Sequence, residues 1–192
     1  NPNPATISGT PIVCVGSTVT LTNTSSGGTW TSGNTGQATI GASSGVMTGV
    51  SAGNPVITYM LPTGCYTITT ATIDPLPAAI TGTMTVCIGF TTTLSDATPS
   101  GTWSSSNTSI ATVVAGTGVV TGVATGVATI TYTLPTGCIA TASVTVNPNP
   151  PAITGTTNVC VGLTTTLFNA TGGGTWTSSN TSVATIGSTT GV

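Results

Sequence analysis

The residues that could do chemistry in this sequence are few, and most of them are cysteines. The 192 residues include five cysteines and two carboxylates, Asp74 and Asp96, whereas Lys, Arg and His are absent. A serine or threonine nucleophile needs a neighbouring base, and a metal ion needs several ligands. Two carboxylates could act on a glycosidic bond, but these two have no counterparts elsewhere in the repeats described below. The sequence therefore predicts no catalytic residue, no cofactor and no metal site.

The absence of positive charge also bears on partners. Proteins that bind nucleic acids use Lys and Arg to neutralise phosphates, so we expect no nucleic-acid partner. No run of apolar residues approaches the roughly 18 that a membrane-spanning helix needs, so we expect no membrane span in this segment. The net charge of −2 leaves little repulsion between copies, which favours self-association.

Cysteines and tryptophans recur with a constant period, which is the sequence signature of an internal repeat. The period is 73, the step that separates Cys14 from Cys87 (87 − 14 = 73) and Trp30 from Trp103 (103 − 30 = 73). The residues that follow the period are Cys14, Cys87 and Cys160, then Cys65 and Cys138, and finally Trp30, Trp103 and Trp176.

Each repeat opens with a proline-rich joint, either Asn-Pro-Asn-Pro or Asp-Pro-Leu-Pro. Proline fixes its own φ and favours an extended conformation in the residue before it, so these joints are predicted to be short, stiff spacers. The predicted repeats are 1–73, 74–146 and 147–192. The third repeat is incomplete because it stops well short of a full period, and we expect the chain to be a fragment of something longer.

Within a repeat, short stretches alternate apolar residues with threonine, a pattern typical of half-buried antiparallel strands. The clearest stretch is 128–134, and similar ones cover 18–21, 91–94 and 139–146. Clusters of Gly, Ser, Asn and Pro between them indicate turns, and nothing indicates a helix. The sequence therefore predicts an all-β sandwich in each repeat. A domain of this size buries little surface and needs further stabilisation, which disulfides between the cysteines could provide.

Three motifs point to a known family: Val-Gly-x-Thr-x-Thr-Leu, Trp-x-Ser-x-Asn-x-x-x-Ala-Thr-Val and Gly-Val-Val-Thr-Gly-Val-x-x-Gly-x-x-x-Ile-Thr. Together they resemble the bacterial Ig-like domain of group 2, the invasin/intimin type, almost end to end in each repeat. The resemblance implies tandem immunoglobulin-like β-sandwich repeats with this period of 73, and a role in surface stalks and adhesins. The added cysteine pair departs from the family pattern and resembles the long repeat proteins secreted by Bacteroidetes-type bacteria.

The regular cysteines indicate disulfides and an oxidising, extracellular location. A Cys14–Cys65 bond within one repeat would stabilise the fold by about 4 kcal/mol. In the implied Ig topology, however, these residues lie at opposite ends of the sandwich, roughly 25 Å apart, and a disulfide joins Cα atoms within about 7 Å. The alternative is a bond from Cys14 in one repeat to Cys138 in the next. Both pairings remain open at this point.

The tryptophans and asparagines each allow two interpretations. One tryptophan per repeat at an Ig-like position is expected to pack in the core, although an exposed aromatic ring could stack on a sugar. Four asparagines lie in Asn-x-Ser/Thr sequons, but such triplets arise by chance in a chain rich in Ser and Thr. The sequon residues are Asn23, Asn107, Asn169 and Asn180.

These observations predict a structural repeat segment of an extracellular bacterial surface stalk or filament rather than an enzyme. Self-association into rods or filaments is expected. The alternative is an adhesin module that binds glycans or a host or partner surface. For the incomplete repeat 147–192, a neighbouring subunit could supply the missing strands by β-augmentation, although the simpler expectation is that the array continues.

Overall fold

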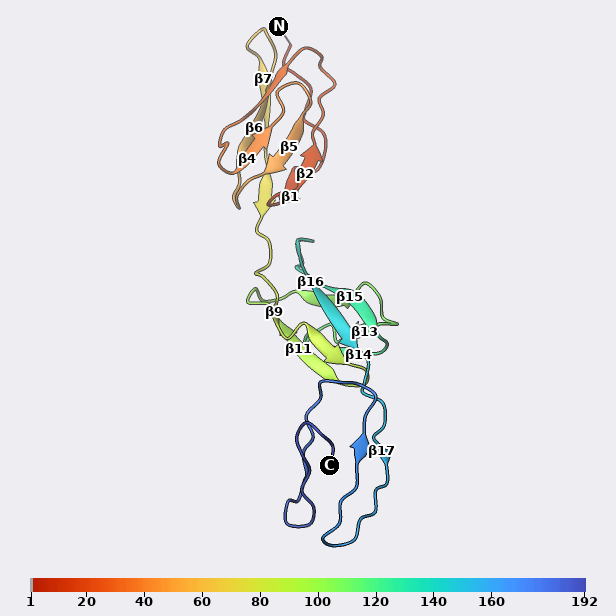
Figure 1. Cartoon of the computed structure of the whole chain (residues 1–192). Coiled ribbons are helices and arrows are strands. Elements are labelled where there is room, and N and C mark those ends of the chain that lie inside the picture. Colours follow the sequence, from red (N-terminus) through yellow and green to blue (C-terminus); the bar gives the residue numbers. More distant parts are fainter. Residues whose placement is uncertain (1) are drawn as a thin grey trace. The chain divides into compact units, whose positions relative to one another are not determined.

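The computed structural model describes residues 2–192, and all of its regular elements are strands (Figure 1). None of these residues lies in a helix. The chain divides into two compact units, Asn1–Val146 and Asn147–Val192. The predicted all-β fold is confirmed. The predicted repeat boundaries, including the one at 73/74 inside the first unit, stay predictions.

The first part of unit Asn1–Val146 has two antiparallel three-stranded sheets and one parallel pair of strands. Its strands are β1 (Ile12–Cys14), β2 (Thr18–Thr20), β3 (Thr29–Ser32), β4 (Ala38–Ile40), β5 (Val46–Gly49), β6 (Val56–Met60), β7 (Tyr66–Thr70) and β8 (Thr72–Asp74). The sheet orders are β2-β5-β4 and β3-β6-β7, and β1 pairs with β8. A buried cluster that includes Leu21, Trp30, Met47 and Ile57 forms the first core.

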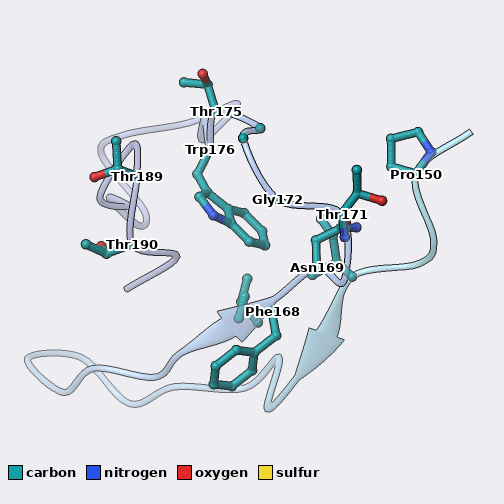
Figure 2. A pocket seen from close by; sticks show the side chains of 13 residues that line it. Pro150, Phe168, Asn169, Thr171, Gly172, Thr175, Trp176, Thr189 and Thr190 are labelled. Carbon is teal, nitrogen blue, oxygen red and sulfur yellow. The ribbon is translucent and has the colours of Figure 1, made fainter.

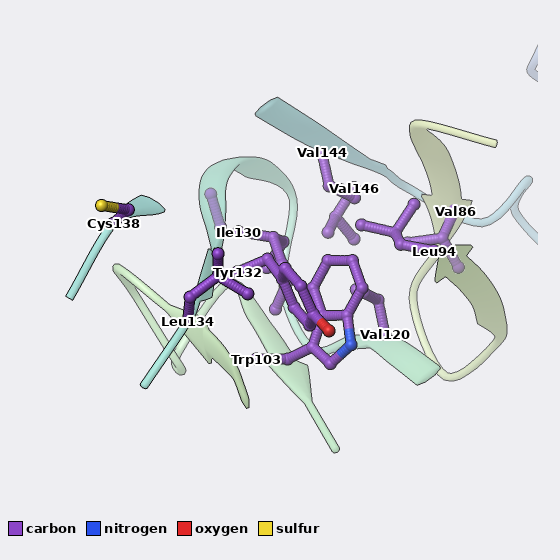
Figure 3. Close-up of a cluster of buried hydrophobic side chains, with 12 residues drawn as sticks. Val86, Leu94, Trp103, Val120, Ile130, Tyr132, Leu134, Cys138, Val144 and Val146 are labelled. Atoms are coloured by element: carbon purple, nitrogen blue, oxygen red, sulfur yellow. The ribbon is translucent and has the colours of Figure 1, made fainter. Parts of the chain in front are cut away.

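The second part of the same unit has two four-stranded sheets. Its strands are β9 (Thr81–Gly82), β10 (Thr85–Cys87), β11 (Thr91–Ser95), β12 (Thr102–Ser105), β13 (Ala111–Val113), β14 (Val119–Gly122), β15 (Gly126–Thr133) and β16 (Ile139–Asn147). The sheet orders are β10-β16-β15-β12 and β13-β14-β11-β9. The second core includes Leu94, Trp103, Val120 and Ile130 (Figure 3).

Strand β15 shows how the alternating sequence builds this core. Successive side chains of a strand point to opposite faces, and Ala128, Ile130 and Tyr132 are all buried while the threonines between them are only half-buried. The strand predicted over 128–134 is therefore present, with its apolar residues on the buried face. β15 continues through a tight turn into β16, with which it pairs antiparallel along its whole length.

Unit Asn147–Val192 has only two short strands, β17 (Thr154–Gly155) and β18 (Leu167–Phe168), which pair antiparallel. Residues 175–178, one period after β12, are not in a regular strand. β12 owes its regular form to the ladder that it makes with β15. No strand described within Asn147–Val192 provides such a ladder, and backbone groups without a ladder partner do not hold strand geometry.

Candidate functional site

Cys14 lies beside Asp74, the residue at which the chain leaves the first core for the second. It is the last residue of β1, which runs parallel to β8 with Cys14 level with Asp74. The preceding residue, Val13, is buried in the first core, so alternation along the strand turns the Cys14 side chain to the opposite face. Asp74 is followed directly by Pro75 of the joint. The Cys14 thiol group is thereby placed beside the connection between the two parts.

Cys138 is fixed by the turn that joins β15 to β16. The Leu134 N–H donates to the Cys138 carbonyl, and the Gly137 N–H donates to the Leu134 carbonyl, both at 2.9 Å. Gly137 has a φ of 87°, a left-handed conformation that glycine adopts without steric cost. Cys138 is 1% exposed and belongs to the second core. Figure 3 shows it with Leu134 at one end of that cluster.

Cys14 and Cys138 form a disulfide that connects the two cores. The Sγ atoms are 2.02 Å apart, and the Cα atoms are 5.6 Å apart. Cys14 packs against the second core, although its strand belongs to the first. The Cys138 Sγ lies 4.0 Å from the carbonyl oxygen of Asp74, so the bond lies against the joint itself. Of the two pairings that the sequence left open, the structure has Cys14–Cys138.

Strand direction explains why Cys14 does not pair with Cys65. Cys65 immediately precedes β7, and Cys14 is level with Asp74, nine residues further along the chain (74 − 65 = 9). Nine extended residues span about 30 Å, whereas a disulfide requires Cα atoms within about 7 Å. Cys65 instead closes a turn of the same kind as Cys138, in which the Leu61 N–H donates to the Cys65 carbonyl at 2.9 Å.

Cys87 and Cys160 stand one and two periods after Cys14. Cys87 ends β10 as Cys14 ends β1, and both are half-buried. Cys160 is exposed. Among the described residues, Cys87 and Cys160 are free thiols.

A second recurring feature is a tyrosine that lies against the tryptophan. The Trp103 and Tyr132 ring centroids are 4.7 Å apart, and the two side chains are 7% and 5% exposed. The Tyr132 hydroxyl accepts from the Gly101 N–H at 2.9 Å and donates to the Thr98 carbonyl at 2.6 Å. The same contacts occur one period earlier among Trp30, Tyr59, Gly28 and Ser25.

Sequence reasoning placed the tryptophans in the core but missed their tyrosine partners. The available signal was the spacing of Tyr59 and Tyr132, which also follows the period (132 − 59 = 73). Trp30 and Trp103 are buried, so their rings offer no platform for a sugar. Trp176, one period later, is only half-buried.

Trp176 lines an open pocket of about 580 Å³ in unit Asn147–Val192. Figure 2 shows its indole ring directed toward the space above Phe168. Thr171 and Gly174 also line this pocket, in the places that Thr98 and Gly101 take one period earlier. A β-carbon added at Gly174 would meet nothing within 4 Å, whereas one at Gly101 would lie 2.6 Å from Cε1 of Tyr132. The pocket therefore lies where Tyr132 and Tyr59 lie one and two periods of 73 residues earlier.

The four sequon asparagines have structural roles in turns. Each Oδ1 accepts from the backbone N–H two residues further on, as in an Asx turn. The pairs are Asn23 with Ser25, Asn107 with Ser109, Asn169 with Thr171 and Asn180 with Ser182. Their side chains thus stabilise the local turns.

Asp96 lies 73 residues after Asn23 and 73 residues before Asn169, so it occupies the position of an asparagine. Its Oδ1 accepts from the Thr98 N–H at 2.7 Å, but its Oδ2 is buried without a hydrogen-bond partner. The corresponding Asn23 uses its Nδ2 to donate to the Ala5 carbonyl at 2.6 Å. Asp74 lies beside the disulfide instead, so the two carboxylates belong to different places. The described residues contain no group of three or more His, Cys, Asp or Glu side chains suited to a metal ion.

Replacing Asp96 with asparagine (D96N) should raise the free energy of unfolding by about 1 kcal/mol, because an amide nitrogen would give the buried position a donor. The measurement is the midpoint of urea unfolding, followed by tryptophan fluorescence. The reverse change at the equivalent position, N23D, should lower the stability by a similar amount. A D96N protein no more stable than the parent would contradict the expectation.

Residues 67–138, which include most of the second core and end at the disulfide, match the bacterial Ig-like domain family, group 2. The predicted family resemblance is confirmed for this stretch. The matched stretch contains both Trp103 and Tyr132, so the contact between these two rings lies within it. Cys138 is the last residue of the stretch. No curated protein sequence matches the chain.

Several solved structures are similar to the chain. A C-terminal fragment of intimin in complex with the intimin-binding domain of its translocated receptor is 18% identical, with a TM-score of 0.38, and the match covers 67% of this chain and 53% of the fragment. Domains 1–6 of the surface layer protein SbsC are 21% identical, with a TM-score of 0.30 and coverage of 79% and 26%. Mouse cadherin-23 EC22–24 is 12% identical, with a TM-score of 0.34 and coverage of 77% and 65%. The chain therefore spans about half of the intimin fragment and about a quarter of the SbsC structure.

Among residues 2–192, no helix has the length and apolar character required to cross a membrane.

Proposed function

We propose that this chain is a structural segment of an extracellular bacterial surface stalk or filament, in which consecutive Ig-like repeats are linked by disulfides. The observation that carries the proposal is the Cys14–Cys138 bond between two separate cores. A bond within one repeat would stabilise that repeat alone. A bond between repeats makes the connection itself resistant to extension, which is the property that a stalk needs.

The path of a pulling force supports this function. A force applied at the two ends of the chain enters through β1 and reaches the second core through the disulfide, without passing along the residues between the two cysteines. The cysteines are 124 residues apart in sequence, and that length of chain would extend by about 440 Å if it unravelled. Because the disulfide bypasses these residues, the applied force cannot extend them while the bond is intact.

Composition supports an extracellular structural function over the alternatives. Disulfides persist in oxidising compartments, and the matched family consists of bacterial Ig-like domains. The chain has no Lys, Arg or His and only two acidic residues, so it offers no acid–base machinery for an enzyme. Low net charge also favours contacts between copies, consistent with self-association into rods or filaments.

Single-molecule force spectroscopy on the full chain, pulled from its two ends, tests the proposal. The oxidised chain should release about 440 Å less contour length than the reduced chain. The C87S variant should behave as the parent does, because Cys87 makes no disulfide. Equal extension of the oxidised and reduced chains would rule out the proposed mechanical function. Electron micrographs of native material that show only separate monomers would rule out the filament.

The alternative function, an adhesin module for glycans or a host or partner surface, has weaker support, because Trp30 and Trp103 are buried. A glycan array with the full chain distinguishes the two functions. Saturable binding of a defined glycan would favour the adhesin.

A further inference from the structure

Strand β7 lies at the edge of its sheet, and most of its outer side is not covered by another strand. The order of that sheet is β3-β6-β7. The parallel strand β1 covers the same edge only from Thr72 onward, where Ile12 is level with Thr72 and the Thr72 N–H donates to the Pro11 carbonyl at 2.8 Å. Residues 66–70 therefore form an open edge, with no described strand beside them.

The hydrogen bonds to β6 show which backbone groups face this open edge. The Ala71 N–H donates to the Pro55 carbonyl at 2.9 Å, one residue beyond the end of the β6–β7 ladder. Hydrogen-bonded and non-hydrogen-bonded pairs alternate along an antiparallel ladder, so every second residue of β7 directs its backbone groups away from β6. The residues that direct their N–H and C=O groups to the open edge are Tyr66, Ile68 and Thr70.

The same edge is open in the second repeat, which directly follows the first. Residues 139–143 of β16 stand one period after 66–70, and they alternate between exposed and half-buried. The edge of β16 is covered only further along the strand, where the Thr145 N–H donates to the Met84 carbonyl at 2.9 Å. A preceding repeat therefore leaves this edge of the sandwich accessible.

The two open edges differ in the side chains on the outer face of their sheets. The first repeat has four exposed apolar residues there, which we call the apolar strip: Val56 (40% exposed), Met60 (44%), Tyr66 (59%) and Ile68 (57%). Met60 faces Tyr66 across the ladder, and Ile68 lies diagonally between Val56 and Met60, so the strip is continuous. The corresponding residues of the second repeat are Thr129, Thr133, Ile139 and Thr141.

We propose that the open edge of β7 binds β7 of a second copy of this chain, so that two three-stranded sheets join into one. An antiparallel pairing about a two-fold axis at Ile68 places Ile68 opposite the same residue of the other copy, and Tyr66 opposite Thr70 of the partner subunit. In this register, all the backbone groups that face the open edge obtain hydrogen-bond partners. The contact is β-augmentation by an identical strand, with the same surface used on both sides.

The charge of this edge selects a second copy as the occupant. Proteins protect open edges from such pairing with lysines, prolines or bulges, but residues 66–73 contain no charged residue and no proline. Asp74 is the nearest charge, and it pairs with Cys14 of β1. Two copies therefore bring no like charges together, and the pairing places the Ile68 side chains of their apolar strips in contact. A charged partner has no opposite charge to meet at this edge.

Sedimentation equilibrium of the full oxidised chain, at concentrations up to about 1 mM, tests this interface. Because an edge contact is smaller than a standard interface, the expected dissociation constant is about 100 μM. I68K should raise the dissociation constant at least tenfold, because the two-fold axis places the two new charges directly opposite each other. T141K makes the same kind of change at the corresponding exposed residue of the second repeat, so it is the control and should dimerise as the parent does.

A neutral variant and hydrogen exchange give independent measurements. I68T introduces the residue that the second repeat has at this position, and it should weaken dimerisation at least threefold without adding a charge. The amides of Tyr66, Ile68 and Thr70 should exchange more slowly as the concentration of the parent rises. The amides of Thr67 and Thr69 already face β6 and should not change. A dimer without this pattern of protection would associate through another surface and would overturn the proposal.

The inference rests on the self-association that is part of the proposed function, and the outcomes separate the two. Dimerisation of I68K equal to that of the parent, or equal weakening by I68K and T141K, would rule out the β7 interface and leave self-association in place. A parent chain that stays monomeric would rule out both. Dimers linked by a disulfide, which non-reducing electrophoresis detects, would also overturn the interface.

Discussion

Replacing Cys14 with serine (C14S) is expected to lower the free energy of unfolding by about 4 kcal/mol. The bond closes a loop of 124 residues, and the chain-entropy model assigns nearly 5 kcal/mol to a loop of that length, with measured values usually somewhat smaller. Because the bond connects two cores, its loss should also broaden the transition as the cores unfold less cooperatively. Urea unfolding followed by tryptophan fluorescence and circular dichroism measures both effects.

The matched control for C14S is C87S. Cys87 ends its strand in the same way and is equally half-buried, but it is a free thiol, so its replacement should change the stability by less than about 0.5 kcal/mol. Reduction of the parent should reproduce the C14S result. Identical unfolding of C14S and C87S would show that the disulfide does not stabilise the connection.

Replacing Gly101 with alanine (G101A) is expected to destabilise the protein by about 3 kcal/mol. The added β-carbon would lie 2.6 Å from Cε1 of Tyr132, and this ring cannot retreat because it packs against Trp103. Overpacking of a core typically costs about 1–3 kcal/mol, and displacement of the hydroxyl from its two half-buried partners adds to that cost. The midpoint of urea unfolding measures the change.

The same substitution one period later provides the control. At Gly174 a β-carbon would meet nothing within 4 Å, so G174A should leave the free energy of unfolding within about 0.5 kcal/mol of the parent. The contrast between G101A and G174A separates steric overlap with tyrosine from any general effect of replacing glycine. Equal destabilisation by both variants would contradict the steric explanation.

The sequence predicted the strands and the burial of Trp30 and Trp103 better than it predicted their partners, whereas Trp176 is only half-buried. Alternation over 128–134 predicts β15 because one face of that strand is buried. It cannot predict that Tyr132 contacts Trp103, because the contact joins strands whose pairing is set by the sheet. The tyrosine looked like one more apolar position in an alternating stretch.

The cysteines illustrate a second limit. Their spacing shows that they recur, but the choice of partner depends on which end of the sandwich each occupies, and that follows from strand direction. Only the parallel pairing of β1 with β8 places Cys14 level with Asp74 and away from Cys65. The sequence also did not predict that Oδ2 of Asp96 is buried without a hydrogen-bond partner, because the burial of this atom depends on the fold of the surrounding turn.

The span of the Cys14–Cys138 bond affects how the protein must be made. During synthesis from the amino end, Cys14 is made long before Cys138, and both Cys65 and Cys87 are made in between. Domains fold as units while the chain is still being produced, and folding of the first core holds Cys65 about 30 Å from Cys14. Early folding thus keeps Cys14 from pairing with Cys65, and the Cys14–Cys138 bond forms once the second core, which contains Cys138, has folded.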